Sequence, residues 1–313
     1  MTAPRLPIRL LALDIDGTLV GADLVVPART RAAVEEAVSR GVAVALVTGR
    51  MASSARGFAD ALGLTGPLVA CQGALIRLLP PAGDPRLGRL LHHEPLPAAV
   101  AREVCAWSRE QGLEPHLNHL ERLILRADEP NAAAHARYVG GRALLVPDLV
   151  DWIRHPVTKV VAVADPPRPV TVTSLAREAF AGRAEAVISH PRFLEFLAPG
   201  VSKGRAIRWL ARRYGVPLEQ TMAVGDQYND LEMIAEVGHG VAMPSAPAEV
   251  LSIARYVAPP LAEEGAARMI EELVLGRAIS GRRRPVPEDP AASGPAPEPQ
   301  VRRARPARGA GET

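Results

Sequence analysis

The chain has 313 residues, of which 48% are hydrophobic and 4% aromatic, and its formal net charge is +3. This length is enough for about two domains, and the scarcity of aromatic rings argues against a stacking surface for nucleic acid. Residues 281–313 contain seven arginines and four acidic residues, so they account for the whole net charge. The rest of the chain therefore offers no basic face for nucleic acid.

Apolar runs alternate with helical segments along the first part of the chain. Strands are predicted at 8–14, 42–47 and 68–71, and helices at 28–40 and 53–62. Such alternation predicts a parallel sheet with helices on both faces. We therefore expect an α/β protein whose core is a Rossmann-like doubly wound parallel sheet.

A cluster of chain breakers at residues 80–85, Pro-Pro-Ala-Gly-Asp-Pro, predicts a domain boundary. Beyond it, helices are predicted near 97–111 and 170–181, and strands at 121–126, 159–164 and 186–189. This segment is long enough to form an inserted α/β cap domain, which we place at residues 83–189.

The β-α pattern resumes after the insert. Helices are predicted at 203–214, 231–236 and 266–275, and strands at 221–224 and 240–243. The expected core is therefore discontinuous, with residues 1–82 and 190–276. Residues 277–313 are rich in proline and arginine, and we expect a disordered tail there.

Cysteine usage and hydropathy indicate a cytoplasmic protein. Cys71 and Cys105 are too few for a disulfide framework, and a reducing cytosol is the default for such a chain. No apolar run reaches about 18 residues, and Asp14 interrupts the N-terminal one, so we expect neither a membrane span nor a signal peptide. The composition indicates no membrane partner and no obligate protein partner.

The most informative motif is Asp14-Ile15-Asp16-Gly17-Thr18, which follows the first predicted strand. Carboxylates two residues apart in an extended segment project to the same side, and open α/β sheets bind ligands at the carboxyl ends of their strands. Adjacent carboxylates need a cation or a proton between them, which a Mg²⁺ site with a carboxylate nucleophile provides. For this motif alone, an Asp-Gly turn after a strand is the simpler alternative.

Three further segments lie at strand ends or helix starts. Residues 48–50, Thr-Gly-Arg, offer a hydroxyl and a backbone N–H to an anion, although a threonine N-cap would also explain them. Lys203 opens a helix, where a cation is unfavourable unless an anion compensates it, a solvated surface lysine being the alternative. Asp226 and Asp230 follow another strand, where Asp230 alone would serve as an N-cap.

Taken in order, these segments resemble the haloacid dehalogenase superfamily, in its Cof-type phosphatase branch with a cap of the second kind. The resemblance covers roughly residues 8–275, and the cap lies between the second and third motifs. The matching motifs are Asp14-x-Asp16-Gly17-Thr18, Thr48-Gly49-Arg50, Ser202-Lys203-Gly204 and Gly225-Asp226-x-x-Asn229-Asp230. One departure is Gln72, where Cof-like proteins usually have an asparagine before the glycine.

The resemblance implies a set of roles for these residues. Asp14 is the nucleophile that forms an aspartyl-phosphate, and Asp16 protonates the leaving alcohol and then activates water. A Mg²⁺ ion is held by the carboxylate of Asp14, the backbone carbonyl of Asp16 and Asp226. Asp230 orients the metal site and Lys203 without binding the metal itself. The phosphate oxygens are bound by Ile15, Thr48, Gly49, Lys203 and Asn229.

The implied activity is that of a Mg²⁺-dependent phosphatase of small phosphomonoesters, such as sugar phosphates or flavin mononucleotide. A phosphotransferase or phosphomutase on the same core is the first alternative, and a non-catalytic phosphate-binding module is the second. The intact acids and Lys203 argue against the module. The absence of G-x-G-x-x-G after the first strand excludes a dinucleotide dehydrogenase.

The cap contains weaker candidates for substrate contacts. These are His92, His93, His116, His119, Arg122, Arg126 and Lys159. We expect the histidines to be surface or strand residues rather than metal ligands, because neither pair lies on a clear helix. The arginines are expected to be solvated, a contact with a second anionic group of the substrate being the alternative. Lys159 is expected at the edge of a strand.

Overall fold

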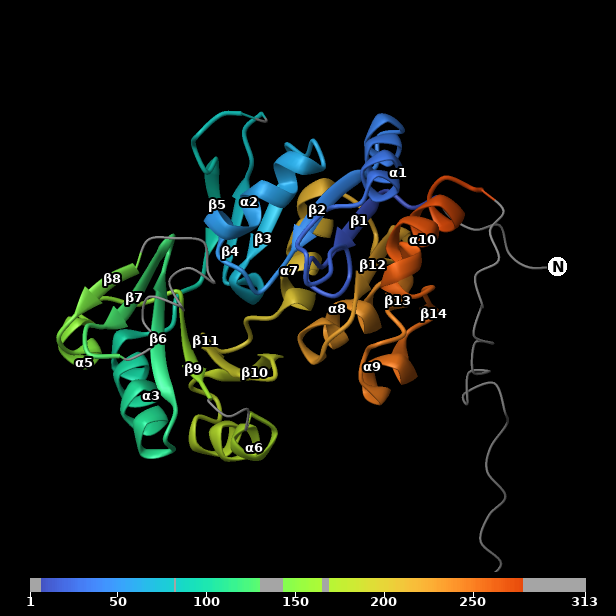
Figure 1. Cartoon of the computed structure of the whole chain (residues 1–313). Helices are drawn as coiled ribbons and strands as arrows, with labels where there is room; N and C mark the ends of the chain where they lie inside the picture. Colours follow the sequence, from blue (N-terminus) through green and yellow to red (C-terminus); the bar gives the residue numbers. More distant parts are fainter. Residues whose placement is uncertain (1–6, 82, 130–142, 165–168, 278–313) are drawn as a thin grey trace, which may run out of the picture.

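The structure is a computed structural model that describes residues 7–81, 83–129, 143–164 and 169–277. The described residues form two units, each built on a β-sheet (Figure 1). The α/β fold class predicted from the sequence is confirmed. The predicted tail lies outside the described residues, except for residue 277.

The core sheet has eight strands within the described ranges. In order across the sheet they are β14 (Tyr256–Val257), β13 (His239–Ala242), β12 (Thr221–Gly225), β1 (Leu10–Leu13), β2 (Ala43–Val47), β3 (Pro67–Ala70), β4 (Leu75–Leu78) and β5 (Arg89–His93). The strands from β14 to β3 are parallel, and β4 and β5 add an antiparallel edge. Because β1 pairs with both β12 and β2, three carboxyl ends meet at one place.

Helices cover both faces of this sheet (Figure 1). They are α1 (Ala28–Ser39), α2 (Ala52–Ala61) and α10 (Gly265–Leu273) on one face, and α7 (Lys203–Tyr214), α8 (Leu231–Glu236) and α9 (Ala248–Ile253) on the other. Short 3₁₀ turns are η1 (Cys71–Gly73), η2 (Leu218–Gln220), η3 (Tyr228–Asp230) and η4 (Leu261–Glu263). Leu11 and Leu13 of β1 pack toward α1, whereas Leu10 and Ala12 pack toward α7, as the alternation of a strand requires. The sheet is therefore doubly wound, as predicted.

The second unit, the cap, is built on a six-stranded sheet within the described residues. In order its strands are β10 (Glu185–His190), β11 (Phe193–Leu197), β9 (Lys159–Val163), β6 (Glu114–His119), β7 (Arg122–Arg126) and β8 (Ala143–Val146). Neighbouring strands are antiparallel, except for the parallel pair of β7 and β8. Helices α3 (Ala98–Glu110), α5 (Leu149–Trp152) and α6 (Pro169–Ala179) belong to this unit, and α3 and α6 cover the face away from the core (Figure 1).

The opposite face of the cap sheet packs on the core. Leu123 and Leu125 of β7 are buried in the same apolar cluster as core side chains. In the turn between β6 and β7, Glu121 accepts hydrogen bonds from the backbone N–H of Ser53 at 2.9 Å and from Nε of Arg77 at 2.8 Å. The cap is therefore closed against the core.

The limits of the two units differ from those expected at residues 83 and 189. The breaker cluster lies in the connection between β4 and β5, which pair with each other in the core sheet. Strand β11 pairs with β9 and β10 in the cap sheet. Breakers mark a hairpin connection as readily as a domain boundary, so we propose that the cap spans residues 94–197.

Candidate active site

The motif residues meet where three parallel strands end. Asp14 follows β1, Thr48 follows β2 and Asp226 follows β12. Lys203 is the first residue of α7, and Asp230 is the last residue of η3. The contacts described below link all four motifs that the sequence placed at strand ends or helix starts.

Lys203 is enclosed by carboxylates. Its side chain is 1% exposed, and Nζ donates to Oδ1 of Asp14 at 2.7 Å and to Oδ1 of Asp230 at 2.6 Å. Burial opposes the charged amine, but the two carboxylates outweigh it and raise the pKa of Lys203 above its usual range. The lysine therefore stays protonated, and the alternative of a solvated surface lysine is wrong.

Burial makes the acids of this site hold protons more tightly than usual. Burial raises the pKa of Asp14 well above its ordinary value, against the opposing effect of Lys203, and the charges of Asp230 and Asp226 add to the rise. Burial together with the charge of Asp230 also raises the pKa of Asp226, to about 6. Such crowded carboxylates favour a cation that offsets their charge.

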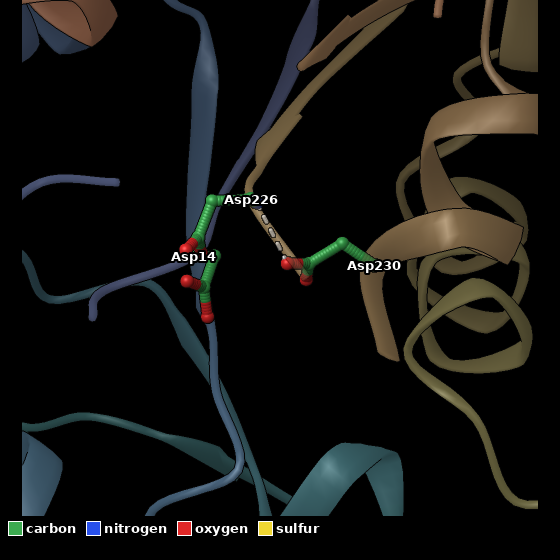
Figure 2. Close-up of side chains that lie close together, drawn as sticks. All are labelled: Asp14, Asp226 and Asp230. Atoms are coloured by element: carbon green, nitrogen blue, oxygen red, sulfur yellow. Dashed lines mark hydrogen bonds between the residues drawn. The ribbon is translucent and has the colours of Figure 1, made fainter. Parts of the chain in front are cut away.

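Carboxylate oxygens of Asp14, Asp226 and Asp230 lie within 4.8 Å of one another. Figure 2 shows the three side chains gathered together. Both oxygens of Asp230 are already engaged: Oδ1 accepts from Lys203, and Oδ2 accepts from the backbone N–H groups of Asp226 and Gln227, each at 3.0 Å. Asp230 thus has both oxygens in hydrogen bonds, while carboxylate oxygens of Asp14 and Asp226 lie close to it and to each other. Hard carboxylate oxygens are the donor set that Mg²⁺ prefers, so these residues fit that ion.

The turn after Asp14 lets Asp226 approach the backbone closely. Gly17 has a positive φ of 77°, and a Cβ added there would lie 2.3 Å from Oδ2 of Asp226. The buried hydroxyl of Thr18 donates to Oδ1 of the same carboxylate at 3.3 Å. A glycine and a threonine at these positions therefore set the place of Asp226.

Asp16 lies apart from Asp14 and binds a different partner. Its side chain is 50% exposed, and its carboxylate forms a two-point ion pair with Arg50, Nε–Oδ2 at 2.7 Å and Nη2–Oδ1 at 2.5 Å. Both residues line the same cavity as Asp14. No role for Arg50 was predicted from the sequence, because its partner is 34 residues away in the chain.

Thr48 is not the N-cap of the helix that follows it. Helix α2 is capped at Met51, whereas the buried Oγ1 of Thr48 accepts from the backbone N–H of Arg50 at 3.1 Å. A hydroxyl that accepts this bond still has its proton to donate to a ligand. Thr48 and Gly49 both line the cavity.

Gln72 occupies the place where Cof-like proteins usually have asparagine. It is 1% exposed and has a positive φ of 60°, and its Oε1 accepts from Nδ2 of Asn229 at 2.9 Å. A Cβ on Gly49 would lie 2.4 Å from Nε2 of Gln72. Gln72 therefore links two of the residues expected to bind phosphate, and sequence reasoning gave it no such role.

The cap closes the cavity from the other side. Its lining residues there include His116, Asn118, Lys159, Phe193 and Glu195. The expectation that Lys159 lies at a strand edge is wrong, because β9 is flanked by β11 and β6 and the residue is 3% exposed.

Three of the other candidates, one of them in the core strand β5, have hydrogen-bond or ion-pair partners. His116 bonds to Glu129 at 3.0 Å, and Arg126 pairs with Glu114 at 3.1 Å. His93 lies 3.0 Å from the hydroxyl of Thr158. Among the described residues, one group of three or more histidine, cysteine or acidic side chains lies close enough together to hold a metal ion. It consists of Asp14, Asp226 and Asp230.

The chain matches the model of the haloacid dehalogenase-like hydrolase family over residues 11–270. It is 31% identical over 245 residues to an HMP-PP phosphatase of Serratia proteamaculans, across 78% of this chain and 87% of that protein. It is 25% identical over 287 residues to a 5-amino-6-(5-phospho-D-ribitylamino)uracil phosphatase of Bacillus subtilis, across 85% and 98% of the two chains. A solved haloacid dehalogenase-like hydrolase from Bacteroides thetaiotaomicron matches with a TM-score of 0.72 and 25% identity, across 85% and 99%.

Among the described residues, no helix combines the length and apolar character needed to cross a membrane.

Proposed function

Because this chain belongs to the haloacid dehalogenase-like hydrolases and is a phosphoric monoester hydrolase of the Cof type, we propose that it uses Mg²⁺ to hydrolyse small phosphomonoesters through an aspartyl-phosphate. The observation that carries this proposal is the buried carboxylate of Asp14, bonded to Lys203 and adjacent to Asp226 at the wall of the cavity. This is the arrangement that a carboxylate nucleophile for phosphorus needs.

The reaction has two displacement steps. A carboxylate oxygen of Asp14 attacks phosphorus, the bond between phosphorus and the ester oxygen breaks, and the alcohol leaves with a proton from Asp16, which acts here in its protonated form and therefore without its ion pair to Arg50. Asp16 then takes a proton from water, whose oxygen attacks the phosphorus of the aspartyl-phosphate and releases inorganic phosphate and the free Asp14 carboxylate. The half-exposed carboxylate of Asp16 lines the same cavity as Asp14, which supports this role.

Charge on the transferred group is offset by neighbouring residues. We assign contacts with phosphate oxygens to Thr48, to Lys203, to Asn229 and to the backbone N–H groups of Ile15 and Gly49. Asp14, Asp226 and the backbone carbonyl of Asp16 would hold Mg²⁺, which when bound supplies positive charge beside the phosphoryl oxygens. The hydrogen bonds of Asp230 to the backbone of Asp226 support its role as an orienting group.

The substrate that we propose is a small phosphorylated metabolite. The relatives named above are phosphatases of two different compounds, HMP-PP and 5-amino-6-(5-phospho-D-ribitylamino)uracil. Sugar phosphates and flavin mononucleotide remain within the proposed class. We also propose a cytoplasmic location, supported by two buried cysteines that are free thiols.

The test is phosphate release from a panel of phosphomonoesters, with and without Mg²⁺, for the wild type and Asp14→Asn. We expect Mg²⁺-dependent release that falls by at least about a thousandfold in the variant, because the amide is a poor nucleophile. Circular dichroism of both proteins controls for folding. Release that is the same in both proteins, or release unaffected by chelation of the metal, would contradict the proposal. A competing alcohol added to the assay separates hydrolysis from phosphotransfer, since a transferase would form the new ester.

A further inference from the structure

The face of the cap sheet that points to the core carries buried polar side chains among apolar ones. Asn118 of β6 lies opposite Lys159 of β9, and Glu195 lies on the neighbouring β11; all three side chains are buried and line the cavity. The next residues along the same strands point the other way. Val160, which follows Lys159, and Phe196, which follows Glu195, pack into the apolar cluster with α3 and α6. Among the positions of these strands that line the cavity, the three polar side chains lie beside Val161 and Phe193.

Lys159 and Glu195 form a buried ion pair in the middle of this face. Nζ of Lys159 donates to Oε2 of Glu195 and, at 2.8 Å, to the backbone carbonyl of Gly49. The other carboxylate oxygen of Glu195 accepts from the hydroxyl of Ser189. Since an ammonium group has three donors and the described residues give this one no third acceptor, one N–H remains for a ligand.

The stability of the fold does not explain why Lys159 and Glu195 form a buried ion pair. Removing two charges from water costs about as much as their attraction returns, and a hydrophobic pair of similar volume is often no less stable. A desolvated ion pair that lines a cleft is instead a marker of a functional site. Its contact with Gly49 places it directly beside the residues assigned to the phosphoryl group.

The charged side chains of the cavity pair within the cap and within the core. The lysine and arginine among its described lining residues are Lys159 of the cap, paired with Glu195, and Arg50 of the core, paired with Asp16. His190 of the cap also lines the cavity, and burial lowers its pKa, which favours the neutral ring. The remaining carboxylate behind this face, Glu129, is bonded to His116. No cation here is in excess to receive a second phosphate, whereas Lys159 and Glu195 present a donor and an acceptor side by side. A hydroxyl group, which both donates and accepts, suits this pair.

We propose that Lys159 and Glu195 are specificity-determining residues: they bind the hydroxyl groups of an uncharged leaving group and disfavour a substrate with a second anionic group. The inference rests on the phosphatase function proposed above. Neither residue takes part in the bond-making steps. They determine which ester binds beside Asp14.

The test compares kcat/KM for glucose 6-phosphate and glucose 1,6-bisphosphate, which differ by one phosphate. The wild type should prefer the monophosphate. Glu195→Gln removes the negative charge that neutralises Lys159. The ratio of kcat/KM for the bisphosphate to kcat/KM for the monophosphate should therefore rise by at least about tenfold, which corresponds to about 1.4 kcal/mol. Glu178→Gln, which removes an exposed carboxylate of the cap on α6, is the matched control and should leave the ratio unchanged.

A double variant covers the case in which Glu195→Gln fails to fold. Lys159→Met with Glu195→Leu removes both charges, leaves neither one buried alone, and should fold. In it, kcat/KM for glucose 6-phosphate should fall by about tenfold relative to 4-nitrophenyl phosphate, whose leaving group has no aliphatic hydroxyl.

The possible results distinguish a failure of this inference from a failure of the proposed phosphatase function. Wild-type preference for the bisphosphate, an unshifted ratio in folded Glu195→Gln, or an unchanged relative rate in the double variant would each overturn the inference while the phosphatase stands. If the wild type releases no phosphate from any of the three esters, including the aryl phosphate, the proposed function fails and the inference fails with it.

Discussion

Asp16 forms an ion pair with Arg50 in this structure, and both residues line the cavity. If Asp16 protonates the leaving oxygen, its removal matters most for esters whose alcohol is a poor leaving group. We predict that Asp16→Asn lowers kcat for alkyl phosphates by about 10²- to 10⁴-fold and lowers it much less for aryl phosphates. Steady-state kinetics with a series of esters of graded leaving-group pKa measures this.

The matched control for that variant is Asp23→Asn, which removes an exposed carboxylate after the same turn. It should leave both classes of ester unaffected. An equal loss for alkyl and aryl phosphates in Asp16→Asn would contradict the role of Asp16 as proton donor to the leaving group.

A second prediction concerns the effect of Asp230 on the affinity for Mg²⁺. Its Oδ2 accepts from the backbone of Asp226 and Gln227, and its Oδ1 accepts from Lys203. An asparagine keeps one acceptor and turns the other into a donor, so Asp230→Asn should lower the apparent affinity for Mg²⁺ by about 10- to 100-fold. The Mg²⁺ concentration needed for half-maximal rate measures the change, and a rate that saturates at the wild-type concentration would count against the orienting role.

Some elements were predictable because local signals agree. The helix predicted at 203–214 is α7, residue for residue: Ser202 caps it through the N–H of Arg205 at 3.0 Å, and Gly215 ends it in the left-handed conformation. The doubly wound core was predictable for the same reason, since its strands are short apolar runs that end in turns.

Other elements follow from partners that are distant in the chain. Strands β6 and β11 carry buried polar residues, so their pattern resembles that of exposed segments. Lys159 was misplaced because its partner Glu195 is 36 residues away. In the site, the acids and Lys203 were predictable from motifs at strand ends, whereas Arg50 and Gln72 were not, because their roles depend on Asp16 and Asn229, brought near by the fold.

The packing of α10 on α1 yields a prediction about elements. Arg29 on α1 makes a two-point ion pair with the buried Glu271 on α10, at 3.1 and 2.6 Å. These hydrogen bonds hold the pKa of Glu271 below its ordinary value of 4.5. A carboxylate with a lowered folded pKa stabilises the fold above the unfolded pKa, and this stabilisation is lost as the pH falls through the folded value.

Glu271→Gln should therefore lower the free energy of unfolding by about 1 kcal/mol at neutral pH, and the difference should shrink steadily below pH 4.5. Chemical denaturation at several pH values measures it. Glu35→Gln, at an exposed position on α1, is the control. A difference that is the same at neutral and acidic pH would show that the substitution disturbs the packing of the helix rather than removing an ion pair.

At the scale of the whole molecule, the cap is closed on the core through the turn between β6 and β7. Glu121 in this turn contacts both the start of α2 and Arg77 of β4. Glu121→Gln should weaken closure and raise KM by about two- to fivefold, corresponding to up to about 1 kcal/mol, because the substrate is enclosed only when the cap is shut.

Initial-rate kinetics and small-angle X-ray scattering test this together, since a cap that opens more often also enlarges the molecule. The control is Glu103→Gln, an exposed cap carboxylate that pairs with Arg183 within the cap. Unchanged KM and unchanged scattering in Glu121→Gln would mean that the apolar contacts of β7 alone keep the cap shut.

The placement of β1 between β2 and β12 also matters while the ribosome makes the chain. Strand β2 emerges soon after β1, but β12 follows much later, and 208 residues separate Thr18 from its partner Asp226. Until then, one edge of the central strand has no neighbour, and an unpaired apolar edge is a template for wrong pairing. The insertion of the cap lengthens this interval, so we expect the nascent chain to depend on chaperones that shield β1 until its last partner arrives.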